Sequence, residues 1–241
     1  MEHWGEAAIP GNFLVNVMPW IRYIPEWVPG SGWKKIVKSS ATAFVFILAM
    51  VLNQSIFAKA QAEVDVVVGH DRLPEMSDRE ALVYVECVMK EVLRWQPVGP
   101  LGIPHAVIED DEYRGWRIPK GSTIVGNIWA MSYDKLVYDE PEKFNPDRFL
   151  NPKTPSPPTF GFGRRSCPGI HLAESTLFIT ISTLLALFEI RPIKDKDGND
   201  VIPEVNMKTN VLVSYPADFK CSITPRSEKA IRLLNTSILE V

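Results

Sequence analysis

One short stretch of the chain, FGFGRRSCPGIHLAE at residues 160–174, concentrates the residue types that could do chemistry. Its single cysteine, Cys167, stands directly before Pro168, and proline is favoured at the first position of a helix. We therefore expect Cys167 at or next to the N-cap of a helix. Unpaired backbone N–H groups and the positive end of the helix dipole lie there, and both stabilise a thiolate over a thiol.

The neighbours of this cysteine suit a charged cofactor. Gly161, Gly163 and Gly169 allow tight turns and a close approach of the backbone to a ligand. Arg164 and Arg165 offer planar guanidinium groups that match carboxylates. The combination predicts an anionic sulfur bound to a metal, within a cofactor that carries carboxylate groups.

Three other interpretations of Cys167 compete with this one. Most lone cysteines in apolar surroundings are small buried packing residues. A zinc site needs about four ligands, and only His171 lies near Cys167 in the sequence. A phosphate-binding loop is a further alternative, but GFGRRSCPG lacks the G-x-x-x-x-G-K-[ST] pattern and follows no clear βαβ unit.

The same residues resemble the signature of a known family. The pattern F-x-x-G-x-R-x-C-x-G, formed by Phe160, Gly163, Arg165, Cys167 and Gly169, resembles the haem-binding signature of the haem-thiolate monooxygenases, the cytochromes P450. It fixes five positions over ten residues, so a chance match is improbable.

Two further motifs stand before this signature in the order of the family. Glu91-Val-Leu-Arg94 resembles the E-x-x-R motif, and FNPDRF at residues 144–149 resembles the P-E-R-F region, with Asp147 where glutamate is commoner. The resemblance extends from about residue 44 to near the C-terminus and has the character of a fungal microsomal-type member. The chain is therefore identified as a member of this family.

The resemblance implies a role for each matched position. Cys167 would be the axial iron ligand of haem b, whose electron donation favours O–O cleavage. His105 and Arg165 would lie against the two haem propionates. The full set of implied cofactor-binding residues is Phe160, Gly163, Arg165, Gly169 and His105.

A second implied group is structural. Glu91 and Arg94 are three residues apart on an expected helix and share one face. With Arg148 they resemble the buried Glu-Arg-Arg cluster of the family, which pins the meander under the haem. We expect these three residues to act as one structural unit, and we assign no catalytic residue.

The family implies a fold that is mainly α with small β-sheets, here the C-terminal, haem-proximal half of a truncated cytochrome P450 fold. It implies a monooxygenase that inserts one oxygen atom of O2 into a small lipophilic organic substrate, as in fungal secondary metabolism. Electrons would come from NADPH through an NADPH-cytochrome reductase, at the cytosolic face of the endoplasmic reticulum membrane.

One family motif is missing where it should stand. The distal helix of the family carries [AG]-G-x-[DE]-T-[TS], but KKIVK at residues 34–38 occupies that place, and Ser39 near the alcohol position has no acid beside it. We expect an internal block and the N-terminal half of the family to be absent from this chain. The alternative function is therefore a non-catalytic haem-binding remnant, or a fragment that binds no haem.

Composition limits the other possibilities. The net charge of −3 and the pI of about 5.9 disfavour nucleic acid as a partner, since phosphate binding needs a basic face. The three cysteines, Cys87, Cys167 and Cys221, are far apart in the sequence and suit a reducing compartment better than a disulfide framework. The N-terminus has no signal-peptide pattern, and the apolar run at residues 41–52 is shorter than a membrane span and predicts a core helix. We expect no transmembrane anchor, although contact with a membrane surface stays possible.

The expected elements must place these motifs within a single partial domain, residues 1–241. Residues 1–38 read as a lid-like segment rich in proline and tryptophan, and residues 39–241 as the haem-binding part. Periodicity and turn signals predict the following elements: a helix over 41–68 broken near Asn53 and stopped at Gly69, a helix over 77–97 with a Ser77–Glu80 capping box and Pro97 at its end, a small sheet over 106–127 with a turn at 119–122, a meander over 139–160, a helix over 168–190, and tail strands at 211–215 and 219–224 forming a hairpin around Pro216.

Overall fold

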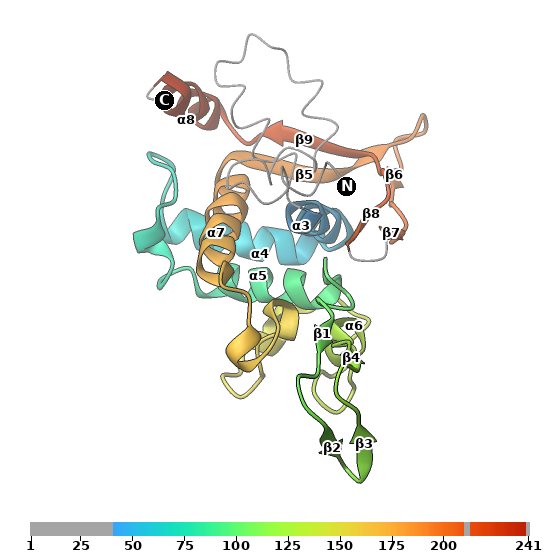
Figure 1. Cartoon of the computed structure of the whole chain (residues 1–241). Coiled ribbons are helices and arrows are strands. Elements are labelled where there is room, and N and C mark those ends of the chain that lie inside the picture. Colours follow the sequence, from blue (N-terminus) through green and yellow to red (C-terminus); the bar gives the residue numbers. More distant parts are fainter. Residues whose placement is uncertain (1–40, 210–212, 240–241) are drawn as a thin grey trace.

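Helices dominate the part of the chain that this computed structural model describes, residues 41–209 and 213–239, and small antiparallel sheets flank them (Figure 1). The expected architecture, mainly α with small β-sheets, is confirmed. The lid-like segment at residues 1–38, Ser39 and part of the first expected tail strand lie outside the described residues.

The apolar run forms the central helix, α3 (Ala41–Leu52), in which nine of twelve residues are buried. The chain then turns by 110° into α4 (Gln54–Val67). The side chain of Asn53 donates a hydrogen bond to the carbonyl of Ala49 at 2.8 Å, which satisfies the end of α3 and stops it there. Gly69, with a φ of +78°, follows the end of α4, so the predicted break and stop are both confirmed.

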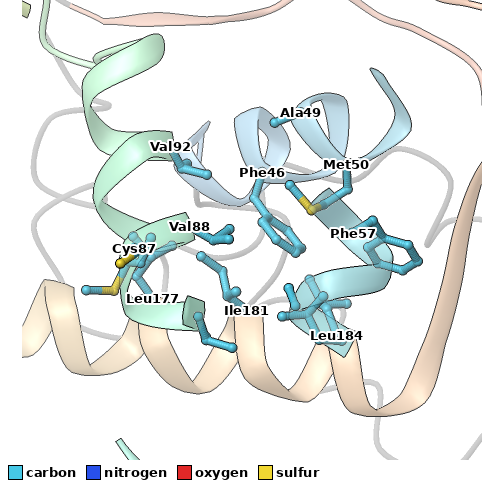
Figure 2. Packing of buried hydrophobic residues seen from close by; sticks show 14 of the residues in the cluster. Phe46, Ala49, Met50, Phe57, Cys87, Val88, Val92, Leu177, Ile181 and Leu184 are labelled. Carbon is cyan, nitrogen blue, oxygen red and sulfur yellow. The ribbon is translucent and has the colours of Figure 1, made fainter. Parts of the chain in front are cut away.

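The core lies where α3 and α4 meet α5 (Val83–Trp95) and α7 (Ile170–Leu187). Figure 2 shows Phe46, Val88 and Ile181 projecting toward one another from α3, α5 and α7. All three side chains are fully buried, and each such burial stabilises the fold by about 1.5–3 kcal/mol. Helix α7 is long and apolar enough to cross a membrane by its length and composition, and 39% of it is buried inside the protein.

Helix α5 begins later than the sequence analysis predicts. Ser77 and Glu80 do not form the capping box; instead a short 3-10 turn, η2 (Met76–Asp78), is capped reciprocally by Glu75 and Asp78. The helix itself begins at Val83 and ends at Trp95, two residues before the expected stop at Pro97. The predicted start of α5 is wrong because the side chain that caps its first backbone N–H groups belongs to another helix, α4.

The small sheet after α5 has two separate strand pairs. Strand β1 (His105–Ala106) pairs with β4 (Thr123–Ile124), and β2 (Asp111–Tyr113) forms a hairpin with β3 (Trp116–Ile118). The hairpin projects away from the helices (Figure 1). A backbone bond from Ser122 to Pro119 of 3.1 Å closes the turn predicted at residues 119–122.

A chain of turns leads from this sheet to the cysteine. After the short helix α6 (Ile128–Ser132), the meander contains only the 3-10 turns η3 (Pro146–Leu150) and η4 (Pro158–Phe160) in its described residues. A third turn, η5 (Gly163–Arg165), precedes Cys167. The predicted meander is thus confirmed.

The tail departs from the prediction in three ways. Helix α7 ends at Leu187, where strand β5 (Phe188–Lys194) begins, and Ile190 and Pro192 are buried as alternate residues of that strand. Strand β5 pairs with β6 (Asp200–Val201) and β9 (Cys221–Pro225), whereas β8 (Ser214–Pro216) pairs with β7 (Met207–Thr209). The two expected tail strands therefore do not form one hairpin. The last helix, α8 (Glu228–Leu239), was not predicted.

Candidate functional site

The Cys167 loop folds back on itself. The backbone N–H of Cys167 donates to the carbonyl oxygen of Phe160 at 2.7 Å and closes the loop between them. Gly161 and Gly163 have φ angles of +78° and +52°, in the left-handed region that side chains other than glycine rarely adopt. The ring of Phe160 packs against the hydrophobic core, which anchors the start of the loop.

Cys167 lies two residues before the N-cap residue of α7, one residue further out than the predicted position at or next to the N-cap. Helix α7 begins at Ile170, and Gly169 is its N-cap residue. The N–H of Ile170 donates to the carbonyl of Cys167 at 3.3 Å, so Pro168 and Gly169 form a turn before the helix. The sulfur therefore stands just ahead of the helix, and a Cβ on Gly169 would lie 3.7 Å from it.

The three thiols of the chain differ in their surroundings. Cys167 is exposed and forms no disulfide, whereas Cys87 is buried in the core. Burial raises the pKa of the Cys87 thiol, and it raises the pKa of Cys221 to about 11. Cys167 is thus the thiol that a ligand can reach, and the interpretation of it as a buried packing residue is wrong.

The surface around Cys167 suits a flat apolar cofactor with charged edges. Phe162 and Leu172, which stand five residues before and five residues after Cys167 in the sequence, are 50% and 59% exposed. Arg164 and Arg165 form no ion pair with any residue that the structure describes. An accessible thiol, bare apolar side chains and arginines without a carboxylate partner fit the proximal side of a haem.

Gly126 brings the strand pair of His105 next to this loop. A Cβ on Gly126 would lie 3.3 Å from the ring of Phe162, so the absence of a side chain lets the two segments touch. Gly126 follows β4, the partner of the strand that carries His105, and His105 is exposed. The structure thus gathers Phe162, Cys167 and the edge of the β1–β4 pair on one side of the molecule.

Glu91, Arg94 and Arg148 form one cluster. Both carboxylate oxygens of Glu91 accept hydrogen bonds from Arg94 at 2.8 Å, and neither side chain has any exposed surface. Arg148 Nε lies 3.2 Å from the same carboxylate, and its side chain is 7% exposed. The backbone N–H of Asn145 adds a bond of 2.8 Å to Glu91.

This cluster also holds the meander by its backbone. Arg94 donates to the carbonyls of Ser132 and Lys143, and Arg148 donates to the carbonyl of Asp139 at 2.6 Å and more weakly to Glu140 and Lys143. A charged group that makes several such bonds fixes the path of the chain as well as neutralising its partner. The cluster therefore sets the course of the segment that leads to Cys167.

Two contacts that hold the site come from outside its motifs and were not predicted from the sequence. Thr159 Oγ1 donates to the carbonyl of Leu93 and joins η4 to α5. Asp147, which stands at a motif position, pairs with Lys59 of α4 at 2.6 Å. No spacing in the sequence signals either contact, because each joins segments that are far apart along the chain.

Within the described residues, no group of three or more histidine, cysteine or acidic side chains could hold a metal ion.

Comparison with known proteins agrees with this geometry. The family model described as Cytochrome P450 matches residues 37–219. The cytochrome P450 monooxygenase claR of Ampulloclitocybe clavipes is 42% identical over 220 residues, which cover 89% of this chain and 40% of that protein. Cytochrome P450 monooxygenase 208 of Postia placenta is 35% identical over 297 residues, which cover 95% of this chain and 58% of that protein. A solved zebra fish cytochrome P450 structure with abiraterone superposes with a TM-score of 0.72 and 33% identity, over 81% of this chain and 45% of that one.

The chain spans about half the length of the curated relatives that it matches, between 40% and 59%. The longer alignments also contain positions of the relative that no residue of this chain matches. The alignment with monooxygenase 208 has 297 positions, but 95% of 241 residues is only about 229, so about 70 positions of the relative face no residue of this chain. The expected absence of an internal block agrees with this difference.

Proposed function

Because the chain belongs to the cytochrome P450 family, we propose that it holds haem b with the thiolate of Cys167 as the axial ligand of the iron. The proposed activity is that of a monooxygenase, which inserts one oxygen atom of O2 into a small lipophilic organic substrate. Electrons would reach it from NADPH through an NADPH-cytochrome reductase, at the cytosolic face of the endoplasmic reticulum membrane.

One observation carries this proposal: the accessible thiol of the chain stands inside the haem-binding signature. Cys167 is exposed, while Cys87 and Cys221 are buried or half-buried. The loop that presents Cys167 is closed by its own backbone bond to Phe160 and anchored in the core. A sulfur held this way needs no rearrangement to meet a ligand, and preorganised ligands bind with less loss of entropy.

Other residues of the chain would hold the edges and the face of the cofactor. Arg165 and His105, both exposed, would pair with its propionate carboxylates. Phe160 and the exposed ring of Phe162 would contribute apolar contact, and Gly163 and Gly169 belong to the same signature. When bound, the haem supplies oxygen activation at its iron, which no side chain of the chain provides.

The experiment that tests ligation is a carbon monoxide spectrum of the reduced, haem-loaded chain. Thiolate ligation gives a red-shifted Soret band, and Cys167→Ala should abolish it. Cys221→Ala is the matched control, because it removes a half-buried thiol outside the signature and should leave the band in place. A red-shifted band that survives in Cys167→Ala would overturn the assignment.

A second candidate function is haem binding without catalysis. About 70 positions of monooxygenase 208 have no counterpart in this chain, and the sequence KKIVK at residues 34–38 lacks the acid expected on the distal side beside Ser39; both observations support this candidate. Oxygen insertion needs proton delivery within hydrogen-bond reach and a site closed to water. The test is NADPH consumption with a reductase and a panel of lipophilic substrates, comparing product with peroxide. Peroxide without product supports the second candidate, and coupled product formation supports the first.

A further inference from the structure

Helix α4 sends two charged side chains, one turn apart, toward the start of α5. Lys59 and Glu63 are four residues apart and share one face of α4. The carboxylate of Glu63 accepts hydrogen bonds from the backbone N–H groups of Tyr84 at 2.7 Å and Val85 at 2.8 Å. Leu82, the N-cap residue of α5, offers no side-chain cap, so Glu63 supplies one from the neighbouring helix.

Lys59 joins the same point of α5 to the meander. Its Nζ lies 2.6 Å from Asp147 Oδ1 and 4.0 Å from the centroid of the Tyr84 ring. An ammonium group over an aromatic face and beside a carboxylate is attracted by both. Burial, followed by the charge of Asp147, raises the pKa of Tyr84, so the ring stays neutral. Lys59 therefore connects α4, α5 and η3 at one place.

Turn η3 is held from two sides by consecutive residues. Arg148 reaches the carboxylate on α5, whereas Asp147 reaches the ammonium group on α4. The meander continues from η3 to Phe160, whose carbonyl accepts the N–H of Cys167. One short segment of chain thus connects η3 to the Cys167 loop.

We propose that Lys59 and Asp147 are positioning residues for the Cys167 loop, because they hold the meander against α4. This inference rests on the proposed function, in which that loop presents the iron ligand. The two side chains are 51% and 54% exposed, and exposed ion pairs contribute little to folding free energy. Loss of the Lys59–Asp147 pair should therefore change the position of the meander more than the free energy of unfolding.

Hydrogen exchange of the peptide at residues 160–167 tests this, in the full chain and without haem. Loss of an exposed ion pair should speed local opening of this peptide by about two- to fivefold in Lys59→Met and Asp147→Asn. Asp147→Glu keeps the carboxylate and should exchange as the parent does. Lys135→Met is the matched control, because Lys135 also pairs with an acid on the meander, Glu142 at 3.3 Å, but away from α4.

The outcomes separate positioning from general stability. Faster exchange at residues 160–167 with unchanged exchange in α3 supports positioning, and a lower share of thiolate-ligated haem in the same two variants extends it to the cofactor. Equal exchange in all variants overturns the proposal, and so does faster exchange throughout the core. If the parent chain takes up no haem, the proposed function fails, while the exchange rates still decide the role of Lys59 and Asp147.

Discussion

Replacing Glu91 by glutamine removes the carboxylate that balances two largely buried guanidinium groups. Arg94 donates to both oxygens of Glu91 at 2.8 Å, and neither side chain has any exposed surface. Arg148 approaches the same carboxylate within 3.2 Å. Water cannot replace the lost charge at a site with no exposed surface, so Arg94 is left as an uncompensated buried cation.

The size of the effect follows from this burial. Breaking one side of a buried ion pair costs about 3–5 kcal/mol, and a domain has only about 5–15 kcal/mol of stability. Glutamine keeps the volume and one carbonyl acceptor, so we expect a loss near 3 kcal/mol. The double variant Glu91→Gln/Arg94→Met leaves no unpaired charge at positions 91 and 94. Its loss of unfolding free energy should therefore be clearly smaller than the sum of the losses in the two single variants.

Urea unfolding followed by far-ultraviolet circular dichroism measures this loss. With a slope of about 1–3 kcal/mol per molar urea, Glu91→Gln should lower the midpoint by about 1 M or more. Glu142→Gln is the control, because Glu142 and its partner Lys135 are 61% and 75% exposed, and its midpoint should hardly move. A shift in Glu91→Gln no larger than in the control, or additive losses in the double variant, would refute the reasoning.

Three further changes probe separate parts of the structure. Gly126→Ala places a methyl group 3.3 Å from the ring of Phe162; the half-exposed ring can shift, so stability should fall by at most about 1 kcal/mol, while haem uptake should weaken measurably in a titration. Asp78→Asn removes a carboxyl whose pKa is lowered from 3.8 to about 2, first by the hydrogen bond from Arg72. A carboxyl group whose pKa is lowered in the folded state stabilises the fold at pH values above its unfolded pKa, and this stabilisation is lost as the pH falls from about 4 to 2. The urea midpoint of Asp78→Asn should therefore be lower than that of the parent at neutral pH and should change less across this pH range. Glu63→Gln weakens the cap of α5 and should cost about 1 kcal/mol in the same unfolding assay.

Each of these changes has a control on the same kind of residue. Gly99→Ala should leave haem uptake unchanged, because no atom lies within 4 Å of the added Cβ, and equal weakening in both glycine variants would contradict the role of Phe162. Asp218→Asn alters an exposed aspartate paired at 3.7 Å, and the acid dependence should persist in it; loss of that dependence there would contradict the assignment to Asp78. Glu80→Gln should not shift the urea midpoint. A shift as large as that of Glu63→Gln would instead support the Ser77–Glu80 capping box that the sequence predicts.

Local patterns in the sequence predicted the fold well where the deciding contacts are local. The break near Asn53 depends on a bond of this residue to Ala49, four residues earlier, and a short polar residue within an apolar run signals it. The shared face of Glu91 and Arg94 depends on helical spacing alone. The signature around Cys167 encloses its own closing bond, between Phe160 and Cys167. In these places the residues that fix the structure stand close together in the chain.

The predictions failed where the deciding partner is distant. The start of α5 depends on Glu63, about twenty residues earlier on another helix, so the nearer Ser77 pattern was misleading. Residues 188–190 continue the apolar period of α7, but they form a strand because β9 pairs with them from more than thirty residues further along. A short apolar run fits either state, and only the tertiary partner decides between them.

The proposed haem ligation and the proposed oxygen insertion would depend on different contacts of this chain. The position of Cys167 is set by the bond to Phe160, the Glu91 cluster and the pairing of Lys59 with Asp147, all between residues that the chain contains. The motif residues Glu91, Arg94, Arg148 and Cys167 are all present in this chain, although about 70 positions of monooxygenase 208 have no counterpart in it. Oxygen insertion needs in addition a proton donor and a closed pocket on the opposite face of the cofactor. Thiolate-ligated haem with NADPH consumed mainly to peroxide would thus support the proximal part of the proposal and refute the distal part, whereas coupled product formation would support both.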